Sequence, residues 1–135
     1  MVEPAQIRHE LIVQSEDRVG LLANISCLLY EMGISILAVH VITDDGQAVV
    51  HLLTDAQQNA RQALCDAGFT IDTREIVVIK LANRLGFLCK LNQALARKGV
   101  SILDLFVTAA EPCGHATLVF TTSNNSQAVQ LLRGR

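Results

Sequence analysis

The sequence predicts an α+β protein made of two βαββαβ repeats, each an antiparallel sheet with two helices on one face. An internal repeat is the first observation behind this prediction. Shifted by 66 residues, residues 17–41 match residues 83–107 at nine of 25 positions without a gap. Apolar runs, helical periodicity and turn residues also follow in the same order in both copies. The second copy has no residues for its last strand, so this edge is expected to stay open or to be covered by the N-terminal segment or a partner chain.

Each copy opens with a strand and a helix. Short β-branched runs, which predict buried strands, lie at 11–13 and 76–79. Asp17 and Asn83 come next, and both residue types are favoured at helix N-caps. Apolar residues then recur at helical spacing until Gly33 and Gly99, where a glycine in the left-handed conformation is expected to end the helix.

A hairpin and a second helix complete each copy. Strands are predicted at 34–43 and 100–109, turns at "DDGQ" (44–47) and "EPCG" (111–114), third strands at 48–54 and 115–122, and helices near 56–67 and 124–133. A fourth strand at 69–74 closes the first copy alone.

The second strand of each copy alternates between two kinds of position. The uniformly apolar positions are expected to face the helices; they are Leu37, Val39 and Val41, and in the second copy Leu103, Leu105 and Val107. The other face carries His40 and Asp104 among hydrophobic residues, so we expect it to be partly exposed or used for association.

The first hairpin is expected to bring two histidines together. If its turn centres on Asp45 and Gly46, His40 lies opposite His51. Such a pair could bind a metal ion, respond to pH or form two half-exposed polar residues on a sheet face. No third ligand is evident, so no metal site and no cofactor are predicted.

Length and charge favour two small units that pack together. A chain of 135 residues has enough apolar material for two small cores, and we assign the first repeat to residues 8–74 and the second to residues 75–135. The net charge of -2 divides into about -6 over residues 1–68 and +4 over residues 69–135. Opposite charges favour pairing of the two units, within one chain or between chains.

Several classes of protein are not expected. The chain has no apolar run of membrane-spanning length and no signal-peptide pattern. Its four cysteines show neither zinc-site nor disulfide-framework spacing, which favours a reducing cytoplasm. No nucleophile with a positioned base, P-loop or metal constellation indicates an enzyme. With no Trp, one Tyr, four Phe and a slightly acidic balance, nucleic-acid binding is not expected either.

Two sequence patterns carry a resemblance to a known family. Both copies read [D/N]-R-x-G, then an apolar helix, then Gly-[I/V]-S-I before a hairpin. This resembles the ferredoxin-like ACT domain, in two tandem copies over nearly the whole chain. The resemblance implies a non-catalytic regulatory protein that binds an amino acid between ACT-like repeats, forms a homodimer and signals to a partner such as a metabolic enzyme. A ligand-independent interaction subunit of such an enzyme is the alternative.

The resemblance also implies which residues bind the ligand. Polar contacts are expected from the residue three before the loop glycine and from the residue two after the helix-ending glycine. With the loop backbone, the implied site residues are Asp17, Val19, Gly20 and Ser35 in the first copy, and Asn83, Leu85, Gly86 and Ser101 in the second. The family often has proline where Val19 and Leu85 stand.

The chemistry of these positions suits an amino acid. A helix N-terminus attracts a carboxylate, a glycine allows close approach of the backbone, and a side-chain oxygen can hold an ammonium group. Asn83 is favoured over Asp17, because a carboxylate there would repel that of the ligand. The alternative is that Asp17 and Asn83 only cap their helices and that Ser35 and Ser101 only bond to neighbouring backbone.

Overall fold

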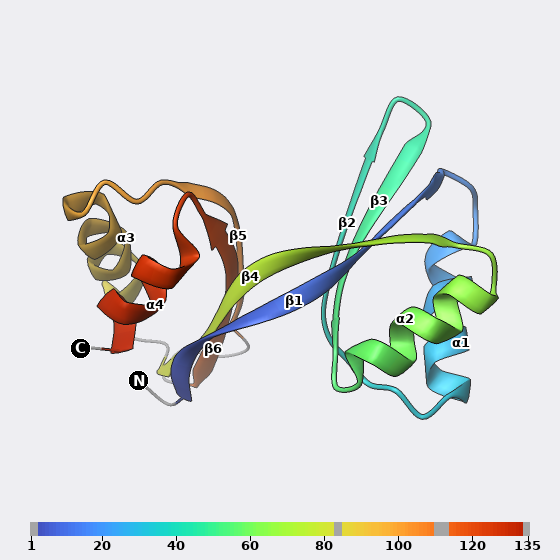
Figure 1. Cartoon of the computed structure of the whole chain (residues 1–135), viewed down its shortest axis with the longest axis horizontal. Helices are drawn as coiled ribbons and strands as arrows, with labels where there is room; N and C mark the ends of the chain where they lie inside the picture. The colour runs from blue at the N-terminus through green and yellow to red at the C-terminus, as the bar shows by residue number, and fades with distance from the viewer. Residues whose placement is uncertain (1–2, 83–84, 110–113, 134–135) are drawn as a thin grey trace. The chain divides into compact units, whose positions relative to one another are not determined.

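The computed structural model describes residues 3–82, 85–109 and 114–133. It contains six strands and four helices over this part of the chain (Figure 1). In order they are β1 (Glu3–Glu16), α1 (Leu21–Glu31), β2 (Ile36–Asp44), β3 (Gln47–Thr54), α2 (Gln57–Asp66), β4 (Thr70–Ala82), α3 (Phe87–Arg97), β5 (Ile102–Ala109), β6 (His115–Thr122) and α4 (Asn125–Arg133).

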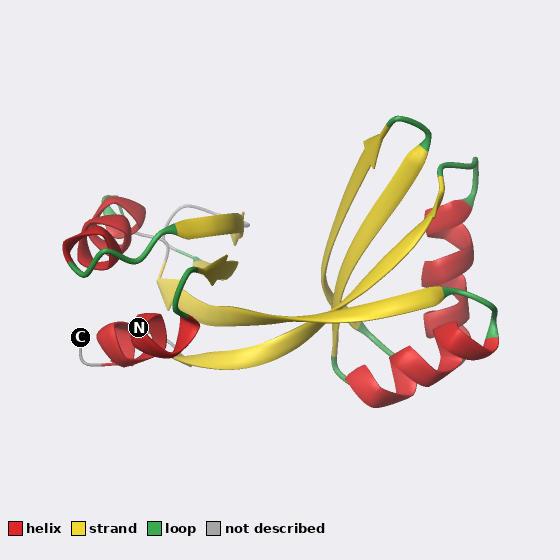
Figure 2. Cartoon of the chain, turned by 45° about the horizontal axis from the view of Figure 1, so that its top comes forward, coloured by secondary structure: helices red, strands yellow, loops and turns green. Residues whose placement is uncertain are grey.

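The chain folds into two compact units with the same topology. One unit is His9–Arg74, and the other runs from Glu75 onward and includes the N-terminal residues as far as Arg8. The hydrogen-bonded strand order β2-β3-β1-β4-β6-β5 gives β2-β3-β1-β4 in the first unit and β5-β6-β4-β1 in the second. The first unit is a βαββαβ fold, and the second has the same strand arrangement with its last strand supplied by the N-terminal part of β1, which confirms the predicted fold class. Figure 2 shows the two long strands, β1 and β4, that contribute to both units.

The N-terminal segment supplies the strand that the second repeat lacks. Ala5 on β1 is fully buried in the core of the second unit. The Nε of Arg133, at the end of α4, donates a hydrogen bond of 2.8 Å to the carbonyl oxygen of Ala5. Of the three alternatives for this edge, a covering N-terminal segment is therefore the one found.

The strand β4, which contributes to both units, is longer than the sequence suggested. The runs at 69–74 and 76–79, predicted as two separate strands, belong from Thr70 onward to one continuous strand, β4. Its first part closes the first unit, and the rest opens the second.

Each unit has its own core between its helices and one face of its strands. The first core includes Leu11, Val13, Leu21, Ile25, Leu29, Val50, Leu52 and Leu64. The second includes Val77, Ile79, Leu91, Leu95, Leu118, Phe120 and Leu132. These are the positions of the helical and alternating patterns, so the hydrophobic periodicity located both cores.

The glycines that were expected to end the helices do so. Gly33 has φ 72° and Gly99 has φ 70°. After α1, Gly33 N donates to Tyr30 O at 3.0 Å and Ile34 N donates to Leu29 O at 2.9 Å. This pair of bonds is a Schellman motif, and the same pair follows α3.

The expected orientation of the second strands is wrong at Leu37 and Leu103. These side chains are 52% and 67% exposed. A β-bulge interrupts the register between Ile36 and Ala38, and another lies between Ile102 and Asp104. The extra residue shifts the alternation by one position, so Ile36 and Ile102 pack against the cores instead.

Beyond the bulges the two copies differ. Leu105 and Val107 pack against the second core as predicted. Val39 and Val41 pair with the core residues Leu52 and Val50, which places them on the helix-facing side, yet both remain exposed. The predicted orientation therefore holds for these two residues, and they stay exposed because β2 is the outermost strand of its unit.

The first hairpin has the predicted turn and register. Asp45 and Gly46 have φ 49° and 76°, as a two-residue turn with both φ positive requires. His40 is the ladder partner of His51, which confirms the predicted pair. The predicted turn at 111–114 lies almost wholly outside the described residues.

Candidate functional site

The two candidate loops begin their helices in the same way. The N-cap of α1 is Gly20, with φ 88° and ψ 2°, and the N-cap of α3 is Gly86, with φ 88° and ψ -3°. The prediction that Asp17 caps α1 is therefore wrong, because a left-handed turn at Gly20 delays the helix to Leu21. Asn83, its counterpart, lies outside the described residues.

Both loops are open beside their glycines. A Cβ added to Gly20 or Gly86 would meet no atom within 4 Å. The preceding residues, Val19 and Leu85, are 106% and 105% exposed. Each repeat thus presents the start of a helix next to a bare apolar side chain, which suits a site that is completed by another surface.

The predicted serines lie at the other end of the helices. Ser35 follows the C-terminus of α1, whereas Gly20 precedes its N-terminus, and a helix of 11 residues is about 16 Å long. Ser101 is related to Gly86 through α3 in the same way. The structure therefore does not bring a loop and its serine together within one repeat.

The backbone of both serines is fixed. Ser35 N donates to Asp55 Oδ1 at 2.9 Å, and Ser35 O accepts from Asp55 N at 3.1 Å. In the second repeat, Ser101 N donates to Ser123 Oγ at 3.0 Å, and Ser101 O accepts from Ser123 N at 2.9 Å. Both serines are exposed, so each is held in place at the surface.

Acidic side chains gather near the first loop. Asp17 N donates to Gly46 O at 2.9 Å, which ties the loop to the turn of the β2–β3 hairpin. Exposed acidic residues at this end of the unit are Glu16, Asp17, Asp44 and Asp45. The repeat shift places Ala82 and Asn83 at the positions of Glu16 and Asp17. Electrostatics therefore disfavours an anionic group at the first loop more than at the second.

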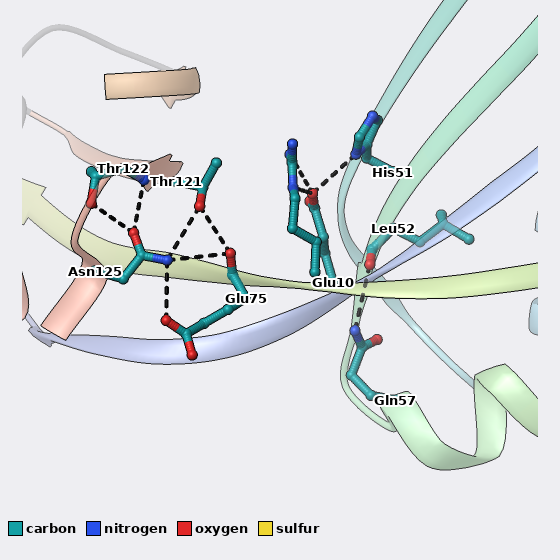
Figure 3. Close-up of polar contacts among 9 residues, drawn as sticks. Glu10, His51, Leu52, Gln57, Glu75, Thr121, Thr122 and Asn125 are labelled. Carbon is teal, nitrogen blue, oxygen red and sulfur yellow. Dashed lines mark hydrogen bonds and ion pairs between the residues drawn. The ribbon is translucent and has the colours of Figure 1, made fainter. Parts of the chain in front are cut away.

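The sequence did not reveal a buried polar cluster in the first unit. Glu10 on β1 is only 1% exposed. Its Oε1 accepts from Arg74 Nε at 2.9 Å, from Arg74 Nη2 at 2.6 Å and from His51 Nδ1 at 3.0 Å (Figure 3). The predicted pairing of His40 with His51 was the available signal, but nothing in the sequence linked Glu10 or Arg74 to it.

A second polar arrangement occurs in both units and is structural. Gln57 Nε2 donates to His9 O at 2.6 Å, and its Oε1 accepts from Thr54 N at 2.8 Å. Asn125 makes the equivalent contacts in the second unit: its Nδ2 donates to Glu75 O at 3.4 Å, and its Oδ1 accepts from Thr122 N at 2.8 Å (Figure 3). Each amide ties the start of a helix to two strands by hydrogen bonds to their backbone groups.

The described residues contain neither a metal-binding cluster of three or more potential ligands nor a membrane-spanning helix. No group of three or more His, Cys, Asp or Glu side chains among them could hold a metal ion. No helix in this part of the chain is long and apolar enough to span a membrane.

Comparison with known families finds a match for most of the first repeat. Residues 9–61 match the model of the ACT domain family, so the first repeat is similar to an ACT domain. The second unit has the same topology. ACT domains are regulatory, ligand-binding modules, and the chain is similar to this class of protein in its fold. A comparison with curated protein sequences finds no significant match.

Solved structures show the same fold over almost the whole chain. Protein BT0572 from Bacteroides thetaiotaomicron superposes with a TM-score of 0.89 at 22% identity, over 96% of this chain and 89% of that one. The ligand-free regulatory subunit of aspartate kinase from Thermus thermophilus gives a TM-score of 0.66 at 16% identity, over 96% of both chains. The corresponding subunit from Thermus flavus gives 0.58 at 18% identity, over 98% of this chain and 96% of that one.

Proposed function

We propose that the protein is a non-catalytic regulatory module that binds an amino acid between ACT-like repeats and passes its occupancy to a partner. This proposal rests mainly on one observation: within each repeat, the loop at the start of the helix and the serine after its end lie apart. Because α1 and α3 hold the two halves of the implied site apart, a ligand that touches both needs two repeats. The functional repeats in this proposal are residues 8–74 and 75–135.

The proposed ligand contacts follow from the loop geometry. The start of α1 or α3 offers backbone N–H groups and a partial positive charge to the ligand's carboxylate. The open space beside Gly20 and Gly86 allows backbone and ligand to approach. Val19 and Leu85 supply apolar contact, and Ser35 or Ser101 supplies a hydroxyl from a second repeat. Asp17 or Asn83 would receive the ammonium group.

The second loop is the better candidate for an amino acid. Glu16, Asp17 and the hairpin acids Asp44 and Asp45 oppose a ligand carboxylate at the first loop. Asn83 presents an uncharged amide in the sequence of the second loop. We therefore assign the ligand to the loop around Asn83, Leu85 and Gly86, with one ligand bound per chain.

A homodimer through β2 completes the proposal. This strand is the outermost of its unit, and it exposes Leu37, Val39, Val41 and Ile42. It carries no charge before Asp44 and no proline or lysine, which are common protections of strand edges.

Three exposed thiols, those of Cys27, Cys65 and Cys89, are free and suit a reducing compartment such as the cytoplasm.

A ligand-independent interaction subunit is the second candidate. The exposed edge of β2 also favours it, since an edge strand can accept a strand of another protein. Two structures that share the fold are regulatory subunits of aspartate kinase, which supports a metabolic enzyme as the partner in either case.

Thermal unfolding separates the two candidates. The purified protein would be unfolded with each of the twenty amino acids in turn. A ligand at a hundred times its Kd stabilises by about 2.7 kcal/mol, which raises the midpoint by several degrees. A rise with one amino acid or a related group supports the sensor. No rise with any of them leaves the interaction subunit as the function.

A further inference from the structure

The paired histidines of the first repeat carry a chemistry that amino-acid binding does not use. His40 on β2 and His51 on β3 are direct ladder partners. Their ring centroids are 5.8 Å apart, and the ring planes are inclined by 32°. We propose that the two imidazoles hold one divalent transition-metal ion, and that Glu10 orients His51 for it.

Glu10 determines which nitrogen of His51 faces the ion. His51 Nδ1 donates to Glu10 Oε1 at 3.0 Å, so Nε2 is left as the ring's electron-pair donor. Figure 3 shows the second ring nitrogen of His51 directed away from Glu10. Histidines that bind metals almost always donate their other N–H to a carboxylate, a carbonyl or water.

Arg74 fixes the carboxylate in turn. Its guanidinium reaches the same Oε1 through Nε at 2.9 Å and Nη2 at 2.6 Å. The contacts come from three strands: Glu10 from β1, His51 from β3 and Arg74 from β4. The orientation of the imidazole therefore rests on several strands of the sheet, as a preorganised ligand requires.

The second repeat shows that the fold does not need these polar groups. The shift of 66 residues places Ile76 and Phe106 at the positions of Glu10 and His40. The second copy is two residues longer at its hairpin, so a shift of 68 residues places Val119 at the position of His51. Phe106 and Val119 are ladder partners, as the two histidines are, and Ile76 and Val119 are buried. A carboxylate as buried as Glu10 is costly unless it is paired. A polar cluster that an apolar one can replace indicates a role other than folding.

The coordination expected is two imidazoles plus water or a small ligand. No group of three potential ligands occurs among the described residues, so the protein would supply only two. Bonds of about 2.0–2.1 Å to each ring nitrogen fit between rings whose centroids are 5.8 Å apart. Imidazole ligands suit Zn²⁺, Ni²⁺ and Cu²⁺, of which Cu²⁺ binds most tightly at a given site.

Calorimetric titration of the full chain with Zn²⁺, Ni²⁺ and Cu²⁺, one at a time, tests the site. The protein would carry Cys27→Ser, Cys65→Ser and Cys89→Ser, which removes exposed thiols as competing ligands. We expect one ion per chain, and the Cu²⁺ complex should show nitrogen hyperfine structure from two imidazoles in electron paramagnetic resonance.

Variants that copy the second repeat locate the ion. His40→Phe and His51→Val introduce the residues found at the equivalent positions, and each should lower the affinity at least tenfold. Glu10→Gln should lower it about 10- to 100-fold, as is typical for outer carboxylates. His115→Ala, at an exposed position, should leave it unchanged. Circular dichroism checks that each variant is folded. If His51→Val does not fold, His40→Phe, which lies on an edge strand, tests by itself whether the ion binds at this pair.

Two results would overturn the proposal. One is the absence of saturable binding of any of the three metals. The other is binding that persists unchanged in folded His40→Phe or His51→Val protein, which would locate the ion elsewhere. Neither result depends on whether the protein binds an amino acid.

Discussion

Arg133 Nε donates a hydrogen bond of 2.8 Å to the carbonyl oxygen of Ala5, 128 residues earlier in the chain. This contact joins the last helix to the first strand and shows how the second repeat is completed. The N-terminal residues take the place that the first part of β4 holds in the first unit. The second unit is consequently discontinuous in sequence, and its integrity depends on both ends of the chain.

Removal of residues 1–8 should therefore destabilise the second unit. The deletion exposes the edge of β4 and uncovers the core around Ala5. We expect a lower unfolding midpoint and faster hydrogen exchange over residues 75–133. Ile7→Ala, at a partly exposed position of the same segment, should change the free energy of unfolding by about 0.5 kcal/mol or less. A truncated protein with unchanged exchange would show that the strand is dispensable.

Substitution of Gly33 tests whether its left-handed conformation stabilises the end of α1. Its φ of 72° lies in the left-handed region, and a Cβ there would meet nothing within 4 Å, so any cost of substitution comes from the backbone alone. Gly33→Ala should cost about 1–2 kcal/mol of unfolding free energy, measured by denaturant titration. Gly33→Asn should cost less, because asparagine tolerates this conformation. Equal costs for the two variants would argue against the conformational explanation.

Val41→Lys tests the dimer. A lysine in the middle of β2 should block pairing of this edge with a second copy and convert the protein to a monomer in sedimentation analysis. Leu103→Lys is the matched control, because Leu103 is also exposed to solvent but lies on β5. It should leave the dimer intact. A monomeric wild-type protein, or a Val41→Lys dimer, would refute assembly through β2.

Exchange of the loop residues tests which repeat binds. Asn83→Asp gives the second loop the carboxylate of the first, and it should weaken amino-acid binding because the charge opposes the ligand's carboxylate. Asp17→Asn makes the reverse change and should allow the first loop to bind, which raises the number of ligands per chain. Both numbers are available from titration calorimetry. Unchanged binding in both variants would exclude these residues from the site.

Local patterns in the sequence predicted most of the fold. The helical cores, the glycine helix ends and the pairing of His40 with His51 all depend on residues that are close in sequence or on a tight turn. The bulge that exposes Leu37 depends instead on how β2 aligns with β3. The covering of the second sheet by residues 3–8 depends on a contact between the two ends of the chain, which no local pattern reveals.

The candidate site was less predictable for the same reason. Asp17 has the chemistry of an N-cap, but the left-handed conformation of Gly20 decides where α1 begins. Glu10 gave no sign of burial, because its partners His51 and Arg74 lie 41 and 64 residues away in sequence. The loops and serines were identified by resemblance, and the structure confirms that the predicted helix lies between them in each repeat.

Titration calorimetry of the full-length protein with the amino acid that most raises its unfolding midpoint tests the central claim most directly. We predict saturable binding of one ligand per chain, lost in Asn83→Ala and in Ser101→Ala. If the two residues meet across a dimer, mixing and reassociating these two inactive variants restores part of the binding. Absence of binding by all twenty amino acids, or full binding by both variants, would contradict an amino-acid site between ACT-like repeats.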